Sequence, residues 1–173
     1  MKHFFLGMLL CLFMLGGCGY KPTAHYAREV LGQKIYAEVI ISRKDPRNSV
    51  LIKDAINEAI VSRFGAKIVN KEEADTVLKI SIGSVNFSPT VYDQYGYVIA
   101  YKALVKLAIS YQHANGKLEK MTTEGEYDFS IEANSVISDT SRFNAIKYSS
   151  LDAIDEFVSK IAIKGLQNGN NNQ

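Results

Sequence analysis

Apolar and polar side chains alternate strictly over several stretches of this 173-residue chain, and elsewhere apolar residues recur at three- and four-residue steps. Alternation with a period of two gives a strand two distinct faces, whereas steps of three and four give a helix one apolar stripe. Alternation predicts strands over about residues 34–41, 76–87, 97–111 and 121–131. The stepped pattern predicts helices over about 49–64 and 145–166, in the order β-α-β-β-β-α.

Two glycines refine these elements. Gly65 follows the first helical stripe and is expected to end that helix in a left-handed conformation. In the second strand, apolar residues are even-numbered up to Ile82 and odd-numbered from Val85 onward. One extra residue at Gly83-Ser84 would return the later side chains to the same face, so we predict a β-bulge there.

The last two strands form a hairpin whose register follows from side-chain parity. Apolar residues are odd-numbered on both strands, and directly opposed residues share a face, so paired numbers must have an even sum. A two-residue Asn115-Gly116 loop gives an odd sum, whereas a three-residue loop over 114–116 with a left-handed Gly116 gives an even one. The predicted pairs are Ile109 with Met121, Leu107 with Thr123, Tyr101 with Phe129, Lys106 with Glu124 and Lys102 with Asp128.

These elements predict an α+β fold. Both helices are apolar on one side only, so we expect them to cover one face of a four-stranded, mostly antiparallel sheet. The other face carries polar side chains: Lys79, Ser81, Lys102, Lys106, Ser110, Glu124, Glu126 and Asp128. Residues 34–166 form the predicted domain, 18–33 a tether without sustained periodicity, and 167–173 a disordered polar tail. Whether residues 67–69 add a further short extended segment stays open at this point.

The first seventeen residues predict a cleaved signal peptide. A basic start is followed by an apolar run over 4–15, which is short for a membrane-spanning helix. The run ends in Leu15-Gly16-Gly17-Cys18, which resembles the bacterial lipobox. Cys18 is therefore the predicted lipid attachment site, and by the sorting rule of such lipoproteins Gly19 implies the outer membrane. The alternative is an ordinary signal peptide with an incidental cysteine.

Composition argues against nucleic-acid binding and against most enzyme classes. Lys and Arg number 20 against 18 Asp and Glu, and a formal charge of +2 gives no strong basic field for a phosphate backbone. Cys11 and Cys18 are the only cysteines, so the domain contains no disulfide or CxxC metal site. No GxSxG, HExxH or P-loop spacing occurs. We therefore assign no catalytic residue, no metal and no cofactor.

A lipobox, a tether and one β-α-β-β-β-α domain together resemble the LptE family of lipopolysaccharide-assembly lipoproteins. The matching segments are Cys18-Gly19-Tyr20, Asn48-Ser49-Val50-Leu51, Ala74-Asp75-Thr76-Val77-Leu78 and Ile99-Ala100-Tyr101. The resemblance implies a non-enzymatic subunit of the outer-membrane lipopolysaccharide translocon, held on the periplasmic side by acylated Cys18. Such a subunit assists assembly of the LptD β-barrel, plugs it in a 1:1 complex and helps deliver lipopolysaccharide to the cell surface. The alternative is another periplasmic-facing adaptor lipoprotein for envelope synthesis or secretion.

Tyrosines concentrate in segment 90–97, between the second and third strands. Strand directions place this segment at the sheet end away from Gly116, beside segment 131–143, so Tyr92, Tyr95 and Arg142 are expected to meet at one tip. The family resemblance makes this tip a candidate contact for lipopolysaccharide or the barrel. Arg142 matches one of two basic positions linked to lipopolysaccharide in the family, but Asp93 and Gln94 stand where the other would be. The alternative for the tyrosines is a loop that packs on its own domain.

Lys102 and Lys106 are a second candidate site, because they lie on the polar sheet face and could meet lipid A phosphates. The competing interpretation pairs both lysines with acids on the neighbouring strand, and the derived register favours it.

Overall fold

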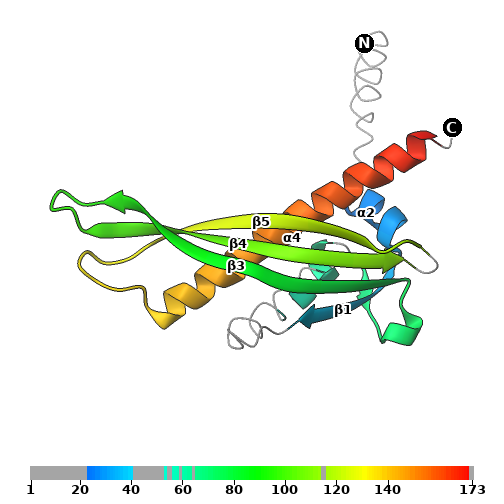
Figure 1. The fold of residues 1–173 in the computed structure, drawn as a ribbon, viewed down its shortest axis with the longest axis horizontal. Helices are drawn as coiled ribbons and strands as arrows, with labels where there is room; N and C mark the ends of the chain where they lie inside the picture. Colours follow the sequence, from blue (N-terminus) through cyan, green and yellow to red (C-terminus); the bar gives the residue numbers. More distant parts are fainter. Residues whose placement is uncertain are drawn as a thin grey trace, which may run out of the picture.

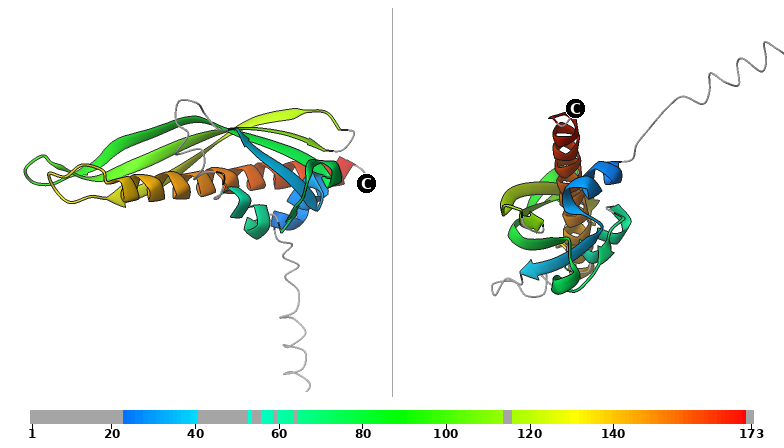
Figure 2. Two further views of the ribbon diagram at one scale, coloured as in Figure 1. Left: turned by 90° about the horizontal axis from the view of Figure 1, so that it is seen from below. Right: turned by 90° about the vertical axis from the view of Figure 1, so that its right-hand side faces the viewer.

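The computed structural model describes residues 23–40, 53, 56–58, 60–63, 65–113 and 116–171. In these parts the chain forms a mixed α+β fold in which a curled sheet arches along a long C-terminal helix (Figures 1 and 2). The elements are α2 Thr23–Leu31, β1 Lys34–Ile40, β2 Lys67–Ile68, a 3₁₀ turn Lys71–Glu73, β3 Thr76–Tyr92, β4 Val98–His113, β5 Glu119–Ser130 and α4 Asp139–Asn171. Residues 53, 56–58 and 60–63 are helical, within the first predicted helix. The predicted signal peptide, Cys18 and loop residues 114–115 lie outside the described residues.

The sheet has five strands in the order β2-β1-β3-β4-β5, so the prediction of four strands is wrong. Strands β3, β4 and β5 are antiparallel, as expected, but β1 runs parallel to both β2 and β3. Parallel neighbours need a crossover connection, and helical residues 56–58 and 60–63 lie in the connection after β1. The fifth strand, β2, lies within the short extended segment that the sequence left open at 67–69.

The predicted hairpin register is confirmed. Each predicted pair occurs, from Ile109 opposite Met121 to Tyr101 opposite Phe129. The bulge is confirmed too, because Ile82 pairs with Leu107 and Ser84 with Lys106, which leaves Gly83 as the extra residue. Gly65 has φ +59°, as expected. Gly116 is not among the glycines with positive φ, so its predicted left-handed conformation is wrong.

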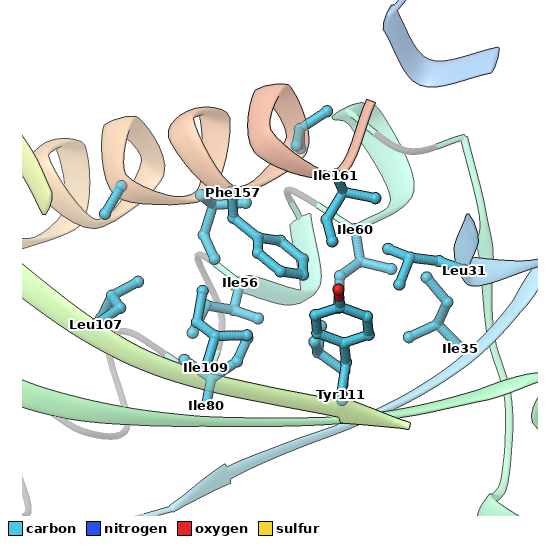
Figure 3. Close-up of a cluster of buried hydrophobic side chains, with 14 of the residues drawn as sticks. Leu31, Ile35, Ile56, Ile60, Ile80, Leu107, Ile109, Tyr111, Phe157 and Ile161 are labelled. Carbon is cyan, nitrogen blue, oxygen red and sulfur yellow. The ribbon is translucent and has the colours of Figure 1, made fainter. Parts of the chain in front are cut away.

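The helices cover one face of the sheet, as predicted, and the core lies between these layers. Figure 3 shows Phe157 of α4 in the middle of this core, where it is fully buried and its ring meets that of Tyr111 at a centroid distance of 5.9 Å. Ile56 and Ile60 of the first predicted helix are fully buried in the same cluster. Phe157 is therefore a central core residue.

Helix α2 and both ends of helix α4 were not predicted. Helix α2 lies inside the segment expected to be a tether, and its Ala27 and Leu31 are fully buried. Helix α4 spans 33 residues and extends past both predicted ends. At its start the Ser141 backbone N–H donates to the Ser138 hydroxyl over 3.1 Å, which caps a polar first turn without apolar periodicity. Its end reaches into the segment expected to be disordered. No helix in the described ranges is long and apolar enough to cross a membrane.

Acidic side chains of α4 accept hydrogen bonds from backbone N–H groups at the outer edge of β5. The backbone N–H groups of Glu124 and Glu126 donate to the carboxylates of Glu156 and Asp152, over 2.7 and 2.9 Å respectively. Between them, Gly125 lies against the α4 backbone, where an added Cβ would come within 2.0 Å of the Ser149 carbonyl oxygen. Because unpaired edge groups invite pairing with other chains, this packing protects the edge as well as fixing the helix.

Candidate functional site

The β3–β4 hairpin ends in a tight turn built around Asp93. Its carboxylate accepts the backbone N–H groups of Tyr95 and Tyr97, each over 2.9 Å. Its own N–H donates to the Tyr97 carbonyl over 2.8 Å, and Gly96 completes the turn with φ +85°. The acid in place of a basic residue therefore has a structural role, because it holds the turn that presents the tyrosines.

The hairpin tip, defined here as residues 91–97, exposes large side chains. Tyr95 is 76% exposed, Tyr92 57% and Tyr97 47%, so the tyrosines do not pack into the core of their own domain. Both views show the connection between β5 and α4 beside this hairpin end (Figures 1 and 2). In that connection Val136 is 87% exposed. This end of the molecule thus offers apolar area that the described part of the chain leaves uncovered.

Arg142 lies in the first turn of α4, not in an irregular segment as expected. Its guanidinium carbon is 4.9 Å from the centroid of the Phe87 ring. Phe87 packs edge-on against Phe129, whose ring stacks on that of Tyr101. The cation is thereby held on an aromatic cluster of the hairpin.

The structure separates the single predicted tip into two neighbouring features. Phe87, beneath Arg142, precedes Tyr92 by five strand residues, which at about 3.3 Å each is about 17 Å. Arg142 and the tyrosines share one end of the molecule, but the cation lies at the base of the hairpin extension and the tyrosines at its end. A ligand that touched both would have to span this length.

A hollow of about 360 Å³ lies at the connection from β5 to α4. Its polar lining consists of serines 130, 135, 138 and 141 together with Glu132. The Ser135 hydroxyl donates to the Glu132 carbonyl over 2.6 Å, and Ser138 caps α4, so these hydroxyls also shape the connection. The sequence pattern did not reveal this hollow, because its residues come from an irregular segment.

Lys102 and Lys106 form ion pairs across the strands. Lys106 meets Glu124 at 2.6 Å, as the register predicts. Lys102 meets Glu126 at 2.5 Å rather than the directly opposed Asp128, and this contact raises the pKa of Lys102. Both lysines are thus neutralised by neighbours, which favours the cross-strand interpretation over a free phosphate site.

At the opposite end of the sheet, a part-buried cluster joins the hairpin to α4. The Tyr111 hydroxyl donates to the Glu119 carboxylate over 2.8 Å, and Lys164 contacts both groups. Burial raises the pKa of Tyr111, and the Lys164 ammonium holds the pKa of Glu119 below its ordinary value. Burial would lower the pKa of Lys164, but its bonds to Glu119 and Tyr111 outweigh burial and raise it. This cluster joins the C-terminal half of α4 to β4 and β5.

The family model of LptE, described as lipopolysaccharide-assembly, matches residues 33–161. The chain belongs to the LptE family. The match covers the sheet, the tyrosine turn, Arg142 and most of α4, whereas Cys18 precedes it. Within the part that the structure describes, no group of three His, Cys, Asp or Glu residues could hold a metal ion.

Solved structures of other proteins share the fold of this chain at low sequence identity. A protein from Xanthomonas campestris is 13% identical, with a TM-score of 0.51, over 82% of this chain and 90% of that one. A candidate lipoprotein from Caulobacter crescentus is 11% identical, with a TM-score of 0.50, over 83% of this chain and 96% of that one. The comparison with curated proteins gives no match. These likenesses concern the fold alone.

Proposed function

We propose that this protein is the non-enzymatic lipoprotein subunit of an outer-membrane lipopolysaccharide translocon. In this role it assists assembly of the LptD β-barrel, plugs it in a 1:1 complex and helps deliver lipopolysaccharide to the cell surface. Acylated Cys18 would hold it on the periplasmic side of the outer membrane. The observation that carries the proposal is the LptE family match over residues 33–161.

The hairpin tip supports a contact role in this proposal. Tyrosine is enriched at interfaces because it adds contact area with few rotatable bonds. Tyr92 and Tyr95 are presented by a fixed turn and exposed at the end of the molecule, so little order has to be gained on binding. Arg142, held over Phe87, supplies a cation at the base of the same hairpin extension. We assign the tyrosines to the barrel or lipopolysaccharide, and Arg142 to an anionic group of either partner.

Purification from membranes tests the function directly. The tagged full chain, extracted in detergent, should emerge in a 1:1 complex with a very large β-barrel protein, and mass spectrometry should find acyl groups on Cys18. A Cys18→Ala variant should lack them and lose firm membrane association. An acylated chain that emerges without any barrel would refute the translocon role and favour the adaptor alternative.

Surface variants test the tip. Tyr92→Ala with Tyr95→Ala should leave thermal unfolding nearly unchanged, since exposed substitutions usually alter stability by under about 0.5 kcal/mol. The double variant should nevertheless weaken barrel co-purification or lipopolysaccharide binding. Arg142→Glu, measured separately, should weaken binding of an anion. It should also lower the free energy of unfolding by about 0.5–1 kcal/mol, because the cation–π contact with Phe87 is lost. Leu118→Ala is the matched control, because Leu118 is 51% exposed at the opposite end. Unchanged binding by all tip variants would exclude the tip.

A further inference from the structure

Helix α2 connects the predicted lipid attachment site to the domain, and it packs against the C-terminal half of α4 (Figure 1). Its Ala27 and Leu31 are fully buried. A Cβ added at Gly165 of α4 would lie 2.5 Å from the Tyr26 carbonyl oxygen and 3.3 Å from a Val30 methyl carbon, so α2 approaches the α4 backbone closely. Nine residues are too few for a stable isolated helix in water, so α2 depends on its contacts with the domain.

The end of α2 is fixed to the sheet at a polar cluster, named the α2 corner and defined as Gly32, Asp75, Thr76 and His113. Gly32 ends the helix with φ +77°, and its backbone N–H donates to the Arg28 carbonyl over 2.8 Å. The Asp75 carboxylate then accepts the backbone N–H groups of Gln33 and Lys34, over 2.9 and 2.8 Å. Because the acceptor is ionised, these two bonds are stronger than bonds between neutral groups.

The Thr76 hydroxyl adds a buried link to the same corner. It donates to the Leu31 carbonyl over 2.6 Å, and its oxygen lies 3.0 Å from His113 Nδ1. A hydroxyl has one proton, and Thr76 gives it to Leu31, so the His113 ring is the donor in the second bond. The hydroxyl is therefore held between the end of α2 and the last residue of β4.

We propose that the α2 corner sets how far the lipid anchor can reach from the domain. The inference rests on acylation of Cys18, which is part of the proposed function. While α2 stays on α4, the chain from Cys18 to Thr23 spans at most about 18 Å. With α2 released, the free chain would run from Cys18 to Lys34 and span at most about 55 Å. Asp75 and Thr76 are positioning residues in this role, because they act on the lipid through α2.

Energy transfer on vesicles tests the reach with the full-length acylated chain. A cysteine introduced by Leu118→Cys is the one free thiol of that chain, because Cys11 leaves with the signal peptide and Cys18 carries the lipid. A fluorophore on this thiol transfers energy to labelled lipids in vesicles of phosphatidylethanolamine and phosphatidylglycerol. The double variant Asp75→Ala with Thr76→Val should release α2, move the domain away from the vesicle surface and lower the transfer.

Hydrogen exchange separates release of α2 from a general loosening of the domain. In the double variant the amides of α2 should exchange at least about tenfold faster, because α2 loses its bonds to the corner, while the amides of β4 keep their wild-type rates. Glu73→Ala is the matched control, since it removes an exposed acid from the neighbouring 3₁₀ turn, and it should change neither readout. Gly165→Ala leaves the corner intact but displaces α2 from α4, so it should also speed exchange in α2 and lower the transfer.

Three results would overturn the proposal. They are unchanged α2 exchange in the folded double variant, released α2 with unchanged energy transfer, and equal acceleration of exchange in α2 and β4. Circular dichroism checks folding, and if the double variant is unfolded, Gly165→Ala decides. Mass spectrometry is read first, because a chain without acyl groups on Cys18 would refute the lipid anchor and this proposal together. The barrel is absent from these measurements, so an acylated chain that fails to co-purify with a barrel would refute the translocon role alone.

Discussion

One methyl group at residue 125 should destabilise the whole domain. Gly125 is the point where β5 crosses α4, and an alanine Cβ there would lie 2.0 Å from the Ser149 carbonyl oxygen and 2.3 Å from the Ala153 nitrogen. Both atoms belong to the helix backbone, so no side-chain rotation can relieve the clash. To restore ordinary contact, α4 would have to move away from the sheet by more than about 1 Å.

That movement acts on the core between α4 and the sheet. Ala153, Ile154 and Phe157 are buried on the same part of α4, and they would lose close packing together. Overpacking usually costs about 1–3 kcal/mol, and a clash with backbone belongs at the upper end or above. We therefore expect Gly125→Ala to lower the free energy of unfolding by at least about 3 kcal/mol. This loss corresponds to a fall in Tm of about 10 °C.

Urea and thermal unfolding followed by circular dichroism would measure this effect. Gly83→Ala is the matched control in strand β3 of the same sheet, because its added Cβ would approach no atom closer than 3.4 Å. Its unfolding free energy should change by under about 1 kcal/mol. Gly96→Ala would meet nothing within 4 Å but would have to adopt φ +85°, so it should lose about 1–2 kcal/mol through strain alone. If Gly125→Ala is as stable as Gly83→Ala, the close approach of β5 to α4 is wrong.

Three other outcomes follow from contacts described above. The double variant Asp152→Ala with Glu156→Ala should expose the β5 edge and lower the free energy of unfolding by about 1–3 kcal/mol. The exposed edge should produce concentration-dependent association in analytical ultracentrifugation. A double variant that stays monomeric would contradict edge protection. Backbone N–H groups of Lys34 and Gln33 lower the pKa of Asp75 below its ordinary value of 3.8, and Lys164 lowers the pKa of Glu119 below its ordinary value of 4.5. Because these contacts stabilise only the ionised carboxylates, the free energy of unfolding should fall as the pH drops below about 4.5. The double variant Asp75→Asn with Glu119→Gln should show a weaker dependence of unfolding free energy on pH. Ile154→Asp should leave no folded domain by circular dichroism, because it buries an unpaired carboxylate.

Sequence reasoning succeeded where a physical constraint left one solution. A strand slipped by one residue turns every side chain to the wrong face, so parity alone predicted the pairing of Leu107 with Thr123 and the extra residue at Gly83. The same argument placed Lys106 opposite Glu124. It could not choose the acid that Lys102 contacts, because diagonal partners on one face lie within reach of a long side chain.

The misses came from elements too short or too polar for a periodic signal. Helix α2 has nine residues, and its buried Ala27 and Leu31 supply one apolar step. The first turn of α4 is polar, so periodicity did not reveal it, and Arg142 was expected in a loop. The signal that could have revealed it was Ser138, three residues before Ser141, as a helix cap.

Helix α4 also determines how far this protein can reach. Helix α2 crosses α4 at Gly165, beside Tyr26. From there α4 runs about 40 Å back to its first residue, Asp139. The tyrosine turn lies farther along the same direction (Figure 1). A bilayer with its headgroups is about 40–45 Å thick. With Cys18 only five residues before α2, a chain acylated there would start at one membrane surface and carry its tyrosines about a full membrane thickness away. If that direction leads into the membrane, the charged open face requires a water-lined passage, since bare hydrocarbon would not accept its lysines and glutamates.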